Sequence, residues 1–212
     1  MPINYWNHLD HNCSYHIYNR AAGDDLLFRD KSDYKFFLKI YKDCFGPYCT
    51  TYAFCLMPNH FHFIIKVKGS ADVFSSIQSE TTVASQNYLK GEIDMNAFLG
   101  DQMRRFFSAI PKRYNAKYDR RGPLFQEKVK RVWISNDDRL RYLIAYVHHN
   151  PIHHYKERGF KDWRYSSFSG YLSDKATLLP RTEVIELFGG EEAFMEFHWK
   201  FKLMKHEEEI DG

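Results

Sequence analysis

Apolar residues follow two different spacings along the 212 residues of this chain. Alternation of apolar and polar positions, typical of strands, predicts β-structure over residues 14–19, 49–54, 61–67 and 128–135. Spacing of three or four, typical of amphipathic helices, predicts helices over residues 33–43, 71–89, 102–108 and 136–149, and another that starts at Pro111. This order of elements predicts an α+β fold, with a ferredoxin-like antiparallel sheet and helices on one face.

The chain divides into two parts. Residues 1–172 contain these elements and are expected to form one domain, and residues 173–212 are expected to form a C-terminal helical extension. Two short amphipathic helices are predicted in the extension, over residues 178–188 and 193–203. Nine acidic residues against three lysines between residues 183 and 212 suit a solvating or accessory role.

Composition narrows the class of protein. No run of 18 apolar residues occurs, so no membrane span is expected. The first residues lack the basic and apolar regions of a signal peptide. Four cysteines form no CxxC pair and no zinc-ligand spacing, which indicates reduced thiols. We therefore expect a cytoplasmic protein.

Positive charge concentrates between residues 101 and 131, where ten lysines and arginines accompany three acidic residues. Phenylalanine and tyrosine are interleaved with these cations. A groove for single-stranded nucleic acid needs this combination, because cations attract phosphates and rings stack on bases. A solvated helix face is the alternative. The candidate DNA-binding residues, including one from the first strand, are Arg20, Arg104, Arg105, Lys112, Arg113, Lys117, Arg120, Arg121, Lys128 and Lys130.

The predicted strand over residues 61–67 begins with the run Met57-Pro58-Asn59-His60-Phe61-His62. Residues two apart in a strand point to the same face, so His60 and His62 are expected side by side, with Phe61 pointing the other way. Two converging imidazoles can bind a divalent metal and leave positions for substrate. Two ordinary half-exposed histidines are the alternative interpretation.

Four motifs occur together with this pair. They are Tyr15-His16-Ile17-Tyr18-Asn19-Arg20, the Met57–His62 run, Arg121-Gly122-Pro123-Leu124-Phe125-Gln126, and Tyr146-Val147-His148-His149-Asn150-Pro151 followed by Asp162-Trp163-Arg164-Tyr165-Ser166-Ser167-Phe168. Over residues 14–172 the combination resembles the single-tyrosine HUH transposases of the insertion-sequence-200-like class. It is most similar to the branch associated with repetitive extragenic palindromes (REP).

The resemblance implies a metal-dependent endonuclease and strand transferase that acts on single-stranded DNA or DNA hairpins. His60 and His62 match the histidines that hold Mg²⁺ or Mn²⁺ in that family. A tyrosine on a helix attacks the scissile phosphate and forms a 5′-phosphotyrosine bond, leaving a free 3′-hydroxyl. The same helix is expected to supply a third ligand with an amide or carboxylate side chain. A homodimer is a further possibility that the family leaves open.

The nucleophile is where the chain departs from the family pattern. Family members carry a tyrosine before the Arg-x-Gly-x-Leu-Phe element, and Ile110 stands at the corresponding position. Tyr114, one helical turn onward, is the first candidate nucleophile, and Tyr118 is the second. Asn115 is the candidate third ligand, with Gln102 or Gln126 as substitutes. The alternative is a catalytically silent protein that only binds DNA hairpins.

The remaining motifs are interpreted structurally. Asn150-Pro151 is expected to end a helix, and Trp163 and Tyr165 are expected in the core. The cluster of His148, His149, His153 and His154 could bind a metal, but because no cysteine accompanies it, contact with phosphate or solvent is the expected role. A third and weaker functional hypothesis, a metal-dependent hydrolase of another class, would act on substrates without nucleic acid.

Overall fold

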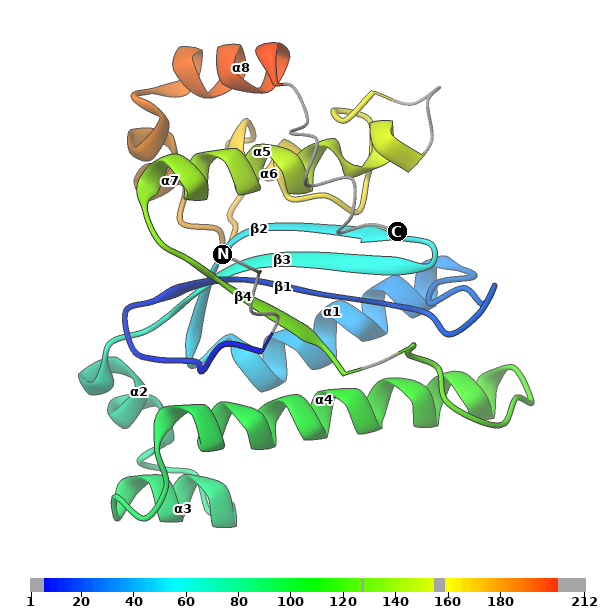
Figure 1. Ribbon diagram of the computed structural model, residues 1–212, viewed down its shortest axis with the longest axis vertical. Helices are drawn as coiled ribbons and strands as arrows, with labels where there is room; N and C mark the ends of the chain where they lie inside the picture. Colours follow the sequence, from blue (N-terminus) through cyan, green and yellow to red (C-terminus); the bar gives the residue numbers. More distant parts are fainter. Residues whose placement is uncertain (1–5, 127, 155–158, 202–212) are drawn as a thin grey trace.

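The computed structural model describes residues 6–126, 128–154 and 159–201. Its centre is a four-stranded antiparallel sheet built from β1 (Ser14–Arg20), β2 (Cys49–Met57), β3 (His60–Val67) and β4 (Lys130–Ile134). The strand order is β2-β3-β1-β4, as in ferredoxin-like folds, and it confirms the α+β class (Figure 1). Pro58 and Asn59 join β2 to β3 in a tight hairpin.

One face of the sheet carries α1 (Lys31–Phe45) and α4 (Met95–Lys117), which pack against each other. The pairing makes β1 parallel to β2 and β3 parallel to β4. Crossovers between parallel strands are right-handed almost without exception, so the two connecting helices fall on the same face. The short helices α2 (Ser70–Ile77) and α3 (Val83–Leu89) precede α4.

The opposite face is also covered, by α5 (Asp137–His154) and the C-terminal helices α6 (Phe168–Tyr171), α7 (Arg181–Phe188) and α8 (Glu191–Lys200) (Figure 1). The expectation of helices on one face alone is therefore corrected. The reason lies in β3, whose residues are buried on both sides of the sheet rather than alternately.

Two of the expected helix boundaries also change. Residues 71–89 form two helices instead of one, and α4 continues through Pro111.

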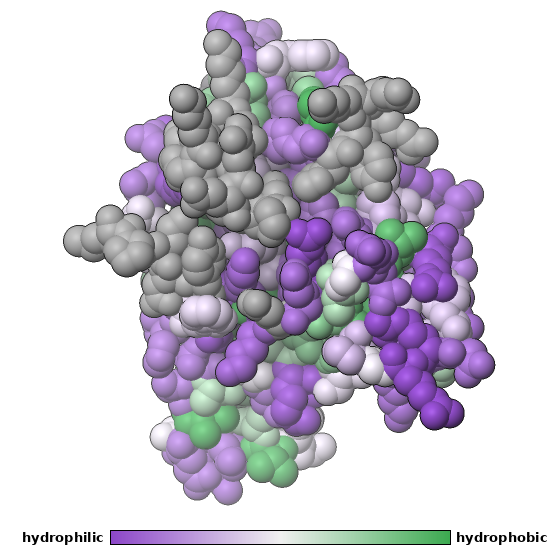
Figure 2. All heavy atoms as spheres, turned by 45° about the vertical axis from the view of Figure 1, so that its right-hand side comes forward, coloured by the Kyte–Doolittle hydropathy of each residue, from purple (hydrophilic) through white to green (hydrophobic). Residues whose placement is uncertain are grey.

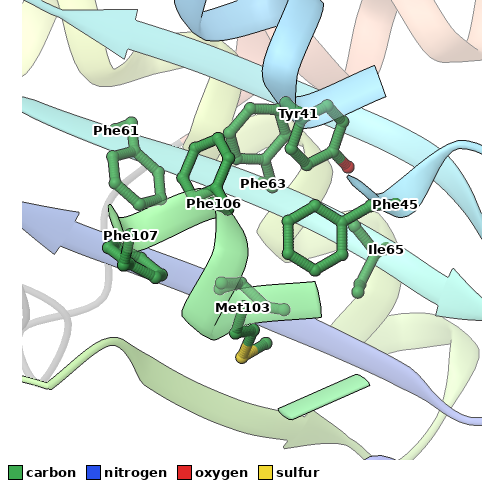
Figure 3. Close-up of a pocket in the computed structure, with 9 residues that line it drawn as sticks. Tyr41, Phe45, Phe61, Phe63, Ile65, Met103, Phe106 and Phe107 are labelled. Carbon is green, nitrogen blue, oxygen red and sulfur yellow. The ribbon is translucent and has the colours of Figure 1, made fainter. Parts of the chain in front are cut away.

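The core between the sheet and α1/α4 is aromatic (Figure 3). Phe61 and Phe63 of β3 point into it, where Tyr41 stacks on Phe63 with ring centroids 3.9 Å apart. Phe106 of α4 and Phe37 of α1 meet edge to face at 4.9 Å. The gap left among these rings is about 20 Å³. Since alternate strand residues face opposite ways, this packing directs His60 and His62 toward α5.

The second core joins α5 to the C-terminal helices. Val184, Phe188 and Phe194 from α7 and α8 are buried with residues of α5.

Trp163 donates its indole N–H to the Leu56 carbonyl at 3.0 Å. Tyr165 stacks on Tyr34 at 3.5 Å. These contacts agree with the expected structural role of the two aromatic residues.

His148 and His149 are buried inside this second core, not exposed to phosphate or solvent as expected. His148 shares hydrogen bonds of 2.8 Å with His198 of α8 and with the Ser167 hydroxyl. His198 Nδ1 lies 2.7 Å from the Phe194 carbonyl, so this nitrogen donates. Burial lowers the pKa of His198 to about 3 and that of His149 to about 4. These rings are therefore neutral packing groups.

Acid should destabilise the protein partly through His198. Its pKa is about 3 in the folded chain and about 6.5 when unfolded, so protons bind the unfolded chain more tightly. The stabilisation is complete above pH 6.5 and is lost as pH falls toward 3. One such group costs roughly 2–3 kcal/mol of unfolding free energy between pH 7 and pH 4.5. Urea unfolding of the wild type and of His198→Gln at both pH values should show a smaller pH dependence in the variant. Equal pH dependence in the two proteins would contradict the assignment.

The described helices include none that is both long and apolar enough to cross a membrane. Cys13, Cys44, Cys49 and Cys55 are free thiols, as expected from their spacing.

Candidate active site

His60 and His62 lie side by side on the face of β3 that α5 covers. Their ring centroids are 5.1 Å apart, and the rings are perpendicular. His60 is 8% exposed and His62 is 2% exposed. The spacing of two residues along a strand thus gives the adjacent imidazoles that the sequence predicted.

The two nitrogens of His60 face two amide oxygens. Nδ1 lies 2.8 Å from the Asn59 Oδ1, and Nε2 lies 3.1 Å from the Asn150 Oδ1. The Asn150 amide is oriented by its Nδ2, which donates to the Tyr146 carbonyl at 3.3 Å. Because amide oxygens only accept, a neutral His60 can satisfy one of them and not both. With Nδ1 donating to Asn59, the Nε2 lone pair would face Asn150 and could bind a metal ion that Asn150 shares.

His62 is held through its other ring nitrogen. Its Nδ1 lies 2.9 Å from the Nε2 of His16 on β1, in a buried hydrogen bond. Tyr18 stacks on both rings, with centroids 5.5 Å from His62 and 4.6 Å from His16. If His62 binds a metal, its ligand atom is therefore Nε2. A hydrogen bond from the second nitrogen is what usually fixes a ligating histidine.

A tyrosine and an amide from α5 complete the cluster. Tyr146 and Asn150 are four residues apart, one helical turn, and both are buried. The Tyr146 ring meets His62 edge to face at 5.7 Å and His16 at 5.9 Å. Helix α5 thus supplies both a phenol and an amide to the histidine pair.

Imidazole nitrogens and an amide oxygen are possible ligands of a divalent cation. His60 Nε2, His62 Nε2 and Asn150 Oδ1 are neutral donors from three positions on two elements. The 3.1 Å between the His60 and Asn150 atoms is close to the edge of an octahedron with bonds of about 2.1 Å, roughly 3.0 Å. Among the described residues there is no group of three His, Cys, Asp or Glu side chains placed to hold a metal. Phosphate oxygens would therefore have to supply the negative charge.

Tyr114 and Tyr118 lie on the other side of the sheet. Tyr114 is buried in the α1/α4 core, and Tyr118 follows it at the end of α4, with the two rings 4.8 Å apart. The Tyr118 hydroxyl donates to Asp33 at 2.7 Å. Burial raises the pKa of Tyr114, and burial together with the Asp33 hydrogen bond raises the pKa of Tyr118. Both shifts oppose phenolate formation. The structure does not bring either tyrosine together with His60 and His62 within one chain.

The predicted third ligand also lies elsewhere. Asn115 belongs to α4, where its Nδ2 donates to the Gly122 carbonyl at 3.0 Å and its Oδ1 accepts from Arg120 at 3.0 Å. The substitute Gln102 is fully buried in α4 and accepts from Arg105 at 2.8 Å. Gln126 donates its backbone N–H to the Arg20 carbonyl at 3.0 Å. The Asn115 and Gln102 side chains thus stabilise α4 and the loop that follows it, and Gln126 joins this loop to β1 through its backbone.

Two of the predicted DNA-binding cations border the histidine pair. Arg20 lies directly opposite His60 on the neighbouring strand, and Lys130 lies opposite Tyr18. Cross-strand partners share one face of a sheet, so both cations are on the side of the candidate site. The Lys130 ammonium is 5.5 Å from the Tyr18 ring centre.

The other cations surround α4 and its following loop. Three are engaged in ion pairs: Lys117 with Asp30 and Asp33, Arg120 with Asp25, and Arg104 with Asp101. Figure 2, in which the right-hand side of Figure 1 comes forward, shows hydrophilic residues gathered at the lower right of the view. The remaining exposed cations are Arg105, Lys112, Arg113, Arg121 and Lys128.

Sequence reasoning missed three members of the cluster: Tyr146, Asn150 and His16. The signal for the first two was present in the Tyr146–Pro151 motif, where a tyrosine precedes an amide by one helical turn. His16 and Tyr18 are two residues apart on β1, on either side of Ile17. Because strand side chains alternate, His16 and Tyr18 share one face of the sheet.

If His62 binds a metal, His16 should tune the affinity for it without being a ligand. Replacing it with phenylalanine keeps a buried ring and removes the hydrogen bond to His62. We expect Mn²⁺ affinity, measured by isothermal titration calorimetry, to fall about 10- to 100-fold. His11→Phe is the control, since His11 is hydrogen-bonded too, but to Lys68 and Tyr88. Unchanged Mn²⁺ affinity in a folded His16→Phe protein would contradict this role.

The fold and the cluster together define a ferredoxin-like α+β domain with a histidine pair, an amide and a helix-borne tyrosine on one sheet face. A solved structure of a REP-associated tyrosine transposase bound to a REP hairpin has a similar fold, with a TM-score of 0.53 and 14% identity. The match covers 81% of this chain and 86% of that chain. No protein-family model and no curated protein sequence matches the chain.

Proposed function

We propose that the protein is a metal-dependent endonuclease and strand transferase for single-stranded DNA, of the tyrosine HUH type, in which Tyr146 is the nucleophile. The observation that carries the proposal is the contact between helix α5 and strand β3. Helix α5 brings Tyr146 and Asn150 to His60 and His62, and the Asn150 oxygen lies 3.1 Å from His60 Nε2. Tyr114, Tyr118 and Asn115, the candidates from sequence, are not carried into the proposal because α4 lies on the opposite face.

A DNA hairpin is the proposed substrate. The similar solved structure is described as a tyrosine transposase bound to a REP hairpin, and the four sequence motifs point to the same branch. Arg20 and Lys130 beside the histidine pair would contact phosphates, which positions DNA without reading its sequence. The exposed cations around α4 would add salt-dependent affinity.

The proposed step is an in-line displacement at phosphorus. The Tyr146 oxygen attacks the scissile phosphate, a new O–P bond forms, and the bond from phosphorus to the 3′ oxygen breaks. The phenol loses its proton, and the leaving 3′ oxygen gains one to become a hydroxyl. The product is a 5′-phosphotyrosine, and attack by a 3′-hydroxyl reverses the step and rejoins DNA without an external energy source.

His60, His62 and Asn150 would hold Mg²⁺ or Mn²⁺, with His16 and Asn59 fixing the two rings. When bound, the metal would polarise the scissile phosphate and neutralise charge developing on its oxygens. The protein itself orients the phenol by packing the Tyr146 ring against His16 and His62. Arg20 and Lys130 would stabilise the same negative charge from the neighbouring strands.

The test is a denaturing-gel assay with an end-labelled DNA hairpin that carries single-stranded flanks. We expect a protein–DNA adduct that resists denaturant in Mn²⁺ and is absent when EDTA replaces the metal. Turnover of small substrates without any adduct would instead support a hydrolase of another class.

A catalytically silent hairpin-binding protein is the second candidate. Burial of the site favours this candidate, because Tyr146 and Asn150 are both fully buried. A phosphate can reach the Tyr146 hydroxyl only if a neighbouring segment moves. Salt-sensitive hairpin binding with no adduct in any divalent metal would support this candidate over the first.

A further inference from the structure

A hollow of about 760 Å³ lies on the other face of β4 from the candidate active site. It is bordered by α4, the loop at residues 123–125 and the segment at Trp6, and its volume falls within the roughly 300–1,000 Å³ typical of ligand sites. The rings of Trp6, Phe107 and Phe125 line it. Trp6 is 51% exposed, and Phe107 meets Phe125 edge to face at 4.9 Å. Aromatic surface is therefore available to a planar ligand.

Three cations line the same hollow, and none of the described residues that line it is an acid. They are Arg104, which is paired with Asp101, and Lys128 and Arg131. Arg131 is partly buried, and its Nε makes no hydrogen bond to any described residue. The Arg131 Nη1 donates to the Asn96 Oδ1 over a long distance of 3.4 Å. A buried cationic donor with few acceptors favours a ligand that brings phosphate or carbonyl oxygens.

Strand β4 lies between the hollow and the face of the sheet that carries His60 and His62. Alternation along β4 puts Lys130 beside Tyr18 on the site face, and the next residue, Arg131, in the hollow. Trp6 is fixed at this edge because the Asn7 N–H donates to the Arg131 carbonyl at 3.1 Å. A strand of DNA that leaves the histidine pair past Lys130 would meet Arg131 and Trp6 next.

We propose that this hollow binds an unpaired base of single-stranded DNA that flanks the segment held at the histidine pair. The base stacks on the exposed face of Trp6, and Lys128 and Arg131 neutralise the adjoining phosphates. Stacking on aromatic rings accepts every base, so the hollow holds the single strand in place and does not by itself select a sequence. The identity of the ligand rests on the proposed function, whereas the binding itself does not require cleavage.

Binding by fluorescence anisotropy, without divalent metal, tests the proposal. Two probes share one hairpin stem: one has a single-stranded extension with bases, and the other has an abasic extension with the same phosphates. Trp6→Ala should weaken binding of the first probe about 5- to 100-fold and leave the second unchanged. Lys128→Ala should weaken both probes alike and lower the salt slope by about one. Trp199→Ala, which removes a 62% exposed tryptophan on α8, is the matched control and should bind both probes like the wild type.

Equal binding of the two probes by the wild type, or equal loss of both in Trp6→Ala, overturns the proposal. So does a wild type that binds neither probe. The outcomes are separable from those of the proposed function. A protein that forms no adduct but prefers the base-bearing probe through Trp6 supports the hollow alone. One that forms the adduct yet ignores the bases supports only the cleavage chemistry.

Discussion

Replacing Tyr146 with phenylalanine should abolish the covalent protein–DNA adduct and slow hairpin cleavage by at least about 10³-fold. The substitution removes the one oxygen that would attack phosphorus. The ring remains, so its edge-to-face contacts with His16 and His62 are kept and the fold should persist. The measurement is the initial rate of adduct formation with end-labelled hairpin DNA and Mn²⁺, together with a thermal unfolding curve of the variant.

Three Tyr→Phe variants serve as controls. Tyr142 stands on α5 one turn before Tyr146, and Tyr114 and Tyr118 lie at the end of α4. Each variant should form the adduct at nearly the wild-type rate. Loss of the adduct in Tyr114→Phe but not in Tyr146→Phe would return the nucleophile to α4 and would require the tyrosine to reach the histidine pair of a second chain.

Replacing His60 with alanine should remove metal-dependent cleavage without unfolding the protein. Loss of a metal ligand that also faces Asn150 should lower the cleavage rate by roughly 10³-fold at saturating DNA. The lost hydrogen bonds should cost about 1–3 kcal/mol of unfolding free energy, too little to unfold a typical domain. Cleavage rates over a range of Mn²⁺ concentrations, with a thermal unfolding curve, provide the measurement.

The control is His11→Ala, which removes a histidine bonded to Lys68 and Tyr88. It should cleave like the wild type. Cleavage by His60→Ala at the wild-type rate would reject the HUH assignment altogether. Retained hairpin binding in the same variant would show that DNA recognition and chemistry use different residues.

The two faces of the sheet carry different groups of side chains. The α1/α4 face is an aromatic core whose cations are largely turned to solvent or to neighbouring acids. The α5 face holds the histidine pair, the amide and the tyrosine. Strand β4 forms the boundary between them, with Lys130 on one face and Arg131 on the other. A single strand of DNA could therefore contact both faces by crossing one edge.

The sequence by itself determined the strands, the ferredoxin-like order and the pairing of His60 with His62. Each of these depends on local periodicity or on connection rules, and residues close together in the sequence specify both. The Met57–His62 run therefore predicted that the two imidazoles lie side by side before any tertiary contact was known.

Only the tertiary structure decided which helix faces that pair. The amphipathic pattern of a helix shows that it buries a stripe, but it does not say which face of a sheet the stripe covers. Both α4 and α5 carry tyrosines and amides one turn apart or less, so periodicity favoured neither. Crossover handedness places α1 and α4 on one face, and α5, which follows the last strand, packs on the other. That choice of face, made by packing and not by local sequence, brings Tyr146 and Asn150 to the histidines and leaves Tyr114 and Asn115 apart from them.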